Sequence, residues 1–309
     1  MQHPIRGNFG DPRTIAPGQL GSDNPNSEGS FTFHNGVDIS APVGTPVYPV
    51  VSGGVRVGSG DEVIVDAADG RTFQYFHIRP SVRTGQHATA YKTVLGRILP
   101  EWNHVHLSEI DLFRVYNPVS PGHLTPYRDG TIPVVEKLDF RTEAGQTLDA
   151  SSLHGTIDVV AKAADTPPVP VPGAWFEFPV TPALVRWQLT GFGRGIVIPW
   201  TTIADFRTTL PPNRDFWRVY ASGTFQNFPV FGHHYFYRVP GRYLFTLTPS
   251  DLDTRRLANG RYVVSVRVAD VCGNSSLLHE LVTVSNTSSK PHLRLLRGIH
   301  LAHATTMRN

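Results

Sequence analysis

The chain has 309 residues, of which 40% are hydrophobic and 17% charged, and its net charge is +3. This length can bury a hydrophobic core and predicts two domains, since a domain usually holds about 150 residues. The chain is weakly basic and contains no run of like charges, which argues against a nucleic-acid partner.

The cysteine content limits the kinds of site. Cys272 is the single cysteine, which excludes an intrachain disulfide and a cysteine-rich zinc ribbon. A metal site would therefore use histidine and carboxylate ligands. The opening residues "MQHPIRGNFGDPR" lack the features of a signal peptide, and no stretch is long enough for a transmembrane span. If the protein acts outside the cell, we expect its leader to lie outside this sequence.

The first part of the chain reads as short strands. Runs such as "TPVYPVV", "EVIVDA" and "TVLGRIL" are rich in Val, Ile and aromatic residues and are separated by Gly, Pro, Asp or Ser turns. The 28 glycines and 26 prolines fit the same pattern. We therefore predict one antiparallel β domain over residues 1–118 in a mainly β protein.

A Pro/Gly-rich connection near residue 118 leads into a second set of strand patterns. In "RYVVSVRVAD" the apolar residues Tyr262, Val264, Val266 and Val268 alternate onto one face. The spacing predicts an immunoglobulin- or fibronectin-like β-sandwich over residues 119–288. Short helices are expected within residues 201–210 and 250–260, and a basic, loosely ordered tail over residues 289–309.

Two histidine-containing motifs have the spacing of a metal site. In "NHVHLSEI", His104 and His106 share one face of a predicted strand, while Val105 points to the other. In "HNGVD", His34 and Asp38 share a face if this stretch is also a strand. Two imidazoles and one carboxylate around zinc, with water in the fourth position, form an open hydrolytic site.

Further histidines are expected near such a site, because a zinc hydrolase also needs a base and an oxyanion donor. One candidate is the member of the His104/His106 pair that does not bind the metal. Another is His77, which ends "TFQYFHI" and is predicted to alternate onto one strand face with Phe73 and Tyr75.

In combination, these motifs resemble the lysostaphin-like (LytM-type) zinc endopeptidases of bacterial cell walls. The shared features are "HNGVD", the following "ISAPVGTPVYPVVSGGV", "YFHI", "VRTGQ" and "HVHLSE", and "GNFGDPR" is similar to the family's opening. The resemblance covers roughly residues 5–115 and implies a β-sheet peptidase domain.

The resemblance also implies roles for individual residues. It makes His34, Asp38 and His106 the ligands of one Zn²⁺ per chain, and His77 and His104 the catalytic pair. Which member of this pair is the general base stays open. All five positions are occupied, which argues against a degenerate, inactive member of the family.

Some positions depart from the family pattern. Before H-x-H the family carries a loop of small residues, whereas this chain has Pro100, Glu101 and Trp102. We expect a different substrate groove there, and a groove-lining loop over residues 14–31. Glu109 could orient a metal ligand, although a solvent-facing role is more common for such a residue.

Other histidines and aromatic residues are weaker candidates. The pairs His233–His234 and His300/His303 have no nearby carboxylate at ligand spacing, so we interpret them as surface or packing residues. A glycan platform and a β-sandwich core are alternative uses of a dense aromatic stretch, and the core is the more common. The stretch comprises Phe216, Trp217, Tyr220, Phe225, Phe228, Phe231, Tyr235, Phe236 and Tyr237.

The sequence thus predicts a secreted, periplasmic or cell-wall-associated zinc metalloendopeptidase that hydrolyses stem or cross-bridge peptides of peptidoglycan. One alternative is a catalytically silent, zinc-containing cell-wall or partner-binding module. Another is a zinc peptidase that acts on proteins. The sequence favours no particular scissile bond, oligomeric state or role for the second domain.

Overall fold

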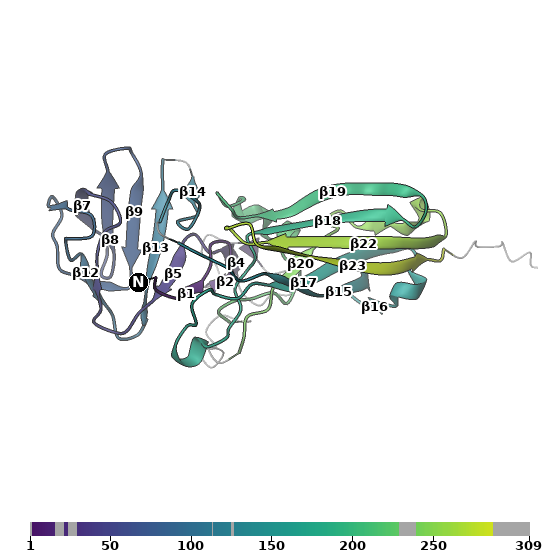
Figure 1. Cartoon of the computed structure of the whole chain (residues 1–309), viewed down its shortest axis with the longest axis horizontal. Coiled ribbons are helices and arrows are strands. Elements are labelled where there is room, and N and C mark those ends of the chain that lie inside the picture. Colours follow the sequence, from purple (N-terminus) through teal and green to yellow (C-terminus); the bar gives the residue numbers. More distant parts are fainter. Residues whose placement is uncertain are drawn as a thin grey trace, which may run out of the picture.

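Figure 1 shows the computed structural model of the chain, which describes residues 2–15, 22–23, 30–112, 114–124, 127–228 and 239–286. The protein is mainly β and its named strands pair antiparallel, which confirms the predicted fold class. Residues up to about 118 and those after it form two parts, here called the N-terminal half and the C-terminal half. They lie end to end along the long axis of the molecule (Figure 1).

The large sheet of the N-terminal half carries the residues singled out in the sequence. Alternate side chains enter its core, including those of Val63, Val65, Phe73 and Tyr75. In spatial order its strands are β1 (Ile5–Gly7), β5 (Val37–Ser40), β13 (His104–Ile110), β9 (Thr72–Phe76), β8 (Val63–Ala67), β7 (Gly53–Val57) and β11 (His87–Ala88), and β14 (Val115–Tyr116) also pairs with β13.

Two smaller sheets complete the N-terminal half. One joins β10 (Ile78–Pro80), β12 (Gly96–Ile98) and β6 (Pro46–Val47), and the other joins β2 (Pro12–Ile15), β4 (Ser30–Phe33) and β3 (Ser22–Asp23). The second of these lies between the large sheet and the C-terminal half (Figure 1).

The C-terminal half contains two further antiparallel sheets. The first consists of β16 (Thr147–Leu148), β15 (Val134–Thr142), β17 (Thr156–Ala164) and β20 (Leu244–Thr246), with β21 (Leu252–Asp253) also paired to β17. The second consists of β19 (Gly195–Asp205), β18 (Leu184–Gly191), β22 (Gly260–Ala269) and β23 (Ser275–Val284). Buried residues of both sheets belong to one hydrophobic core.

Strand β22 confirms the predicted alternation, because Tyr262, Val264, Val266 and Val268 are all buried. Ser265 on the other face is buried as well, and its hydroxyl lies 2.8 Å from Nδ1 of His279. The immunoglobulin- or fibronectin-like assignment and the domain boundaries 1–118, 119–288 and 289–309 stay predictions.

One of the two predicted helices is absent, and the other is reduced to a single turn. Residues 201–205 continue β19, because pairing with β18 outweighs the helical spacing of the apolar residues. In the second place a single 3₁₀ turn forms, η5 (Thr254–Arg256), with Asp253 capping its N-terminus. The other short helices that the structure describes are η1 (Ala150–Ser152), η2 (Gly173–Trp175), η3 (Asn213–Asp215) and α1 (Phe216–Val219). Within the described residues, no helix has the length and hydropathy of a membrane span.

Buried aromatic rings join the two halves. Phe33 of β4 packs against Phe206, Phe216 and Tyr220 of the C-terminal half, with ring centroids 5.0–5.9 Å apart. The Tyr220 hydroxyl donates a 2.8 Å hydrogen bond to the carbonyl of Gly10. Gly10 has φ +91°, and a Cβ there would lie 2.5 Å from the Phe206 ring. This close approach explains why glycine is needed at position 10.

Asp11 is a buried polar link between the halves. Its carboxylate accepts hydrogen bonds from the backbone N–H of Asn8 at 2.7 Å and of Thr181 at 2.8 Å. Burial raises the pKa of Asp11 to about 7, although the Arg13 guanidinium opposes the shift. The folded state therefore holds a proton on this group at pH values where the unfolded chain has lost it.

This shift predicts a pH-dependent contribution to stability. Between pH 4 and 7 the folded state binds more protons at Asp11 than the unfolded state, so its contribution to stability falls as pH rises through this window. We expect the free energy of unfolding of the parent, minus that of Asp11→Asn, to decrease from pH 4.5 to pH 7.5, because only the parent has this titrating group. Urea unfolding at both values measures it. A difference that stays constant or grows would contradict the assigned shift.

Several predictions concern residues outside the described ones. The tail after residue 288, His233–His234, His300/His303, most of the 14–31 loop, Phe231 and Tyr235–Tyr237 belong to this group. Of the remaining aromatic residues, Phe216, Tyr220, Phe225 and Phe228 are buried, as a core assignment predicts.

Candidate metal centre and active site

The pairing of β5 with β13 places two of the predicted ligands side by side. His106 lies opposite Asp38 in the register, and His104 lies opposite Ser40. Val105 and Leu107 enter the hydrophobic core from the other face of β13. His104 and His106 therefore share a face, as the i, i+2 spacing predicts.

His34 reaches the same point by a different route from the one predicted. It lies in the connection between β4 and β5, so the strand-parity argument for His34 and Asp38 is wrong. The chain bends at Gly36, where a Cβ would lie 2.4 Å from the Leu107 carbonyl and 2.8 Å from the His106 ring. The missing side chain gives His34 access to the face of β13.

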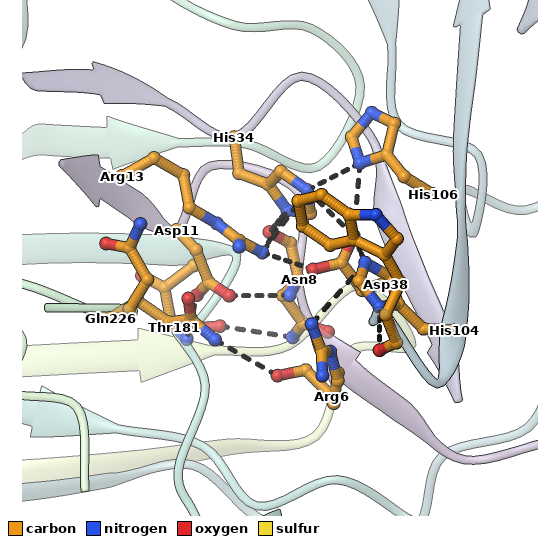
Figure 2. Close-up of polar contacts among 12 residues, drawn as sticks. Arg6, Asn8, Asp11, Arg13, His34, Asp38, His104, His106, Thr181 and Gln226 are labelled. Carbon is orange, nitrogen blue, oxygen red and sulfur yellow. Dashed lines mark hydrogen bonds and ion pairs between the residues drawn. The ribbon is translucent and has the colours of Figure 1, made fainter. Parts of the chain in front are cut away.

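Three potential ligand atoms converge (Figure 2). His34 Nε2 lies 2.9 Å from His106 Nδ1 and 3.3 Å from Asp38 Oδ1, and the last two atoms are 3.1 Å apart. Such a set of lone pairs is repulsive unless a proton or a cation lies among them. Zinc bonds of about 2.0–2.1 Å in a tetrahedral site place neighbouring ligand atoms about 3.3–3.4 Å apart. The triangle therefore fits a zinc ion after small shifts, and this group could bind a metal.

Arg13 of β2 completes the charge balance of the centre. Its Nη2 donates to Asp38 Oδ2 at 2.6 Å, which leaves Oδ1 facing the imidazoles of His34, His104 and His106. Burial opposes ionisation of Asp38, but Arg13 and the neighbouring histidines outweigh it and hold the pKa of this carboxyl well below its usual range. Asp38 is thus a carboxylate at neutral pH.

His34 is neutral for a related reason. Burial and the nearby Arg13 charge lower the pKa of His34 to about 3. A metal ligand must offer a lone pair, so a neutral imidazole suits this role. The Asn8 carbonyl lies 2.8 Å from His34 Nδ1 and accepts its N–H, so that Nε2 carries the lone pair toward Asp38 and His106. Arg13 Nη2 also lies 3.3 Å from this Nε2.

Ser108 supports His106 from the next position on the same face of β13. Its Oγ lies 2.8 Å from His106 Nε2, while His106 Nδ1 faces His34 and Asp38. The hydroxyl fixes the ring orientation, as outer-shell partners of metal-binding histidines do. The i+2 spacing after His106 was the available sequence signal for this residue.

His77 enters the site through a change of backbone conformation. Strand β9 ends at Phe76, and His77 has φ +68°, so it does not share the buried face of Phe73 and Tyr75. That predicted alternation is wrong at His77. The ring stacks on Trp102, with centroids 3.7 Å apart, and its Nδ1 lies 3.2 Å from Asp61 Oδ2. Burial and the neighbouring His104 lower the pKa of His77 to about 4.

His104 lies beside His77, with their ring centroids 4.8 Å apart. Its Nδ1–H donates to the Trp102 carbonyl at 2.7 Å, so Nε2 carries the lone pair. Arg6 Nη2 lies 3.5 Å and Asp38 Oδ1 3.4 Å from this Nε2. Burial lowers the pKa of His104, although Asp38 opposes the shift.

Glu109 and Trp102, which flank the H-x-H motif, lie outside the triangle of ligand atoms. Glu109 is buried but does not orient a metal ligand, because it binds Arg71 at 2.5 Å and His123 at 2.7 Å. Trp102 lies at the site, as expected from the unusual segment before H-x-H. Sequence patterns gave no separate signal for Arg6, Arg13 or Asp61.

The five histidine and aspartate side chains open into a pocket of about 1320 Å³. This volume exceeds the usual range of about 300–1,000 Å³ for small-molecule sites. Both halves of the chain line the pocket, and the C-terminal half contributes Trp175, residues 209–213, Asn227 and Phe228. The pocket thus has room for an extended ligand.

Comparisons with known proteins give similarity to solved structures for part of the chain. The catalytic domain of the prophage-encoded M23 protein EnpA from Enterococcus faecalis, in a mutant form, is 26% identical, with a TM-score of 0.26, over 36% of this chain and 90% of that one. The catalytic domain of the antimicrobial peptidase lysostaphin from Staphylococcus simulans is 21% identical, with a TM-score of 0.26, over 36% of this chain and 89% of that one. Both are catalytic domains of the type that the motifs resemble.

No family model and no curated protein sequence matches the chain.

Proposed function

We propose that the protein is a zinc-dependent endopeptidase that hydrolyses peptide bonds in the stem or cross-bridge peptides of peptidoglycan. The observation that carries the proposal is the triangle of His34 Nε2, Asp38 Oδ1 and His106 Nδ1, with sides of 2.9–3.3 Å, at the base of a pocket that also holds two further histidines. His34, Asp38 and His106 would hold one Zn²⁺.

A zinc ion bound there would supply Lewis acidity and lower the pKa of a water ligand toward about 7. Arg13 keeps Asp38 ionised and occupies Oδ2, so that Oδ1 is the oxygen available to the ion. Ser108 and the Asn8 carbonyl orient the two imidazole ligands. These contacts prepare the ligand set in advance.

His77 and His104 are the proposed catalytic pair. Both carry an Nδ1–H toward a fixed acceptor, Asp61 for His77 and the Trp102 carbonyl for His104, which leaves the lone pair on each Nε2. Arg6 Nη2 lies 3.5 Å from that of His104. One of them would accept the water's proton at Nε2 and pass it to the leaving amine, and a protonated Nε2–H would donate a hydrogen bond to the oxyanion.

The motif resemblance and the size of the pocket support the proposed substrate class. A cell-wall substrate implies an extracytoplasmic location, whether secreted, periplasmic or wall-associated. The five intact site positions favour an enzyme over a silent binding module.

Metal removal tests the proposal. Untagged protein, purified without metal resin, is expected to contain one zinc per chain and to release muropeptides from purified sacculi. Stripping the ion with a chelator should reduce release by at least about 100-fold, and added zinc should restore it. One zinc without release from sacculi or from casein would support the silent module. Release from casein alone would support a protein-directed peptidase.

A further inference from the structure

We propose that the C-terminal half forms one wall of the substrate pocket, and that this composite pocket selects peptides that carry a free carboxylate near the cleaved bond. The inference rests on the proposed function and names the substrate class of the same site.

The wall is part of the pocket that holds the candidate catalytic residues. Trp175, residues 209–213, Asn227 and Phe228 line the same space as His34, His77 and His104. These residues come from loops and from the short helices η2 and η3 of the C-terminal half, more than 60 positions beyond His106 in the sequence. A peptide that fills the pocket would therefore contact both halves.

Hydrogen bonds fix the wall against the N-terminal half. The Asn117 N–H donates to the Thr208 carbonyl at 2.8 Å, and Asn213 Oδ1 accepts from the Thr32 hydroxyl at 2.9 Å. Farther along, the Thr14 N–H donates to Asn227 Oδ1 at 3.0 Å. Because these links cross the junction at several points, the wall is preformed, which lowers the entropic cost of binding a peptide.

Trp175 extends the wall to the catalytic pair. The Arg6 guanidinium lies over the Trp175 ring, 4.5 Å from its centroid, and Arg6 Nη2 is 3.5 Å from His104 Nε2. The Arg6 backbone carbonyl also accepts a hydrogen bond from Gln226 Nε2 at 3.1 Å. Trp175 and Gln226 of the C-terminal half thus position the Arg6 guanidinium next to the proposed reaction centre.

The charge of the lining favours an anionic ligand. Among its described residues, Arg6, Arg13 and Arg114 are basic and Asp38 is the carboxylate. Arg13 already pairs with Asp38, and a bound zinc ion would add positive charge. Arg114 is exposed at the rim, directly before β14, whose Tyr116 pairs with Thr209 of the wall. A guanidinium in this position matches the two oxygens of a carboxylate.

Chemical amidation of the substrate tests the charge preference. Sacculi are compared before and after carbodiimide coupling to ammonia, which converts free carboxylates to amides without changing the peptide bonds. We expect the zinc-loaded parent to release muropeptides about two- to fivefold faster from untreated sacculi, because an ion pair with an exposed guanidinium is weak. Arg114→Gln should bring the ratio of the two rates close to one.

The control is Arg83→Gln, which removes the same charge at an exposed position outside the pocket lining. It should keep the parent's ratio. Equal rates for the parent on both substrates, or an equal loss of selectivity in Arg83→Gln, would overturn the carboxylate assignment. If neither substrate is cleaved, the proposed activity fails, and co-sedimentation of the zinc-loaded chain with both sacculi still tests the preference.

Trp175 variants test the wall itself. Trp175→Ala is expected to raise KM at least about tenfold with a smaller change in kcat, and Trp175→Phe should recover most of the loss because it keeps an aromatic surface. Thermal unfolding shows whether both variants fold like the parent. Unchanged KM in a folded Trp175→Ala protein would overturn the assignment of the wall to substrate binding.

Discussion

Replacing Asp38 with asparagine is expected to remove the metal. Asp38 supplies the negative charge of the triangle, and its Oδ1 lies within 3.3 Å of the ligand nitrogens of both His34 and His106. Asparagine keeps the shape but contributes a neutral, weaker oxygen donor. We expect zinc to fall from about one per chain to less than about a tenth, and muropeptide release to fall at least about 100-fold. Elemental analysis and release from sacculi measure both effects.

The same substitution leaves Arg13 without its buried partner, so folding must be checked separately. Losing one member of a buried ion pair costs about 3–5 kcal/mol. His106→Ala provides a second variant that leaves the Arg13–Asp38 pair intact, and it should also lose zinc. His87→Ala, at an exposed position on β11, is the matched control and should keep both zinc and activity. One zinc per chain in folded His106→Ala would refute the ligand assignment.

Local periodicity predicted the part of the site that lies on a strand. The i, i+2 spacing of His104 and His106 fixes which face they share, because Val105 and Leu107 between and beside them enter the core on the other face, while the two histidines line the pocket. Gly36 lies between His34 and Asp38, and its missing side chain gives room next to the His106 ring.

Periodicity failed where the backbone leaves the extended conformation. His34 lies in a connection between strands, and the left-handed conformation of His77 turns its side chain away from the face of Phe73 and Tyr75. A residue pattern carries little information about a single non-glycine residue with positive φ. Both histidines nevertheless line the same pocket as His104 and His106, which the strand argument does not explain.

Contacts between segments that are distant in the chain could not be predicted from the sequence alone. Arg13 reaches Asp38 only because β2 pairs with β4, and Trp175 reaches Arg6 across the junction of the two halves. The sequence predicts a division near residue 118 but does not indicate how the two parts meet. In the structure, aromatic rings around Phe33 join the two halves, and residues of both line one pocket.

Substitution of the proposed catalytic pair, His77 and His104, should separate the chemical step from metal binding. His104 belongs to none of the three ligand–ligand contacts, so His104→Ala is expected to keep one zinc per chain. Its turnover should fall at least about 100-fold, the usual contribution of an acid–base group. His104→Gln is the matched variant, because it keeps a polar side chain but cannot take up the reaction's proton.

The variant at position 77 must be able to adopt the positive φ of His77. Alanine is disfavoured at φ +68°, so His77→Asn is the better variant, since asparagine tolerates the left-handed region. It should also keep zinc and lose turnover at least about 100-fold, with a smaller change in KM, because His77 acts on the reacting groups and not on the ion. Full activity of either variant would contradict its role as a catalytic residue. Loss of zinc from folded His104→Ala would instead place His104 in the ligand set, and His77 would then be the single histidine left to move the proton.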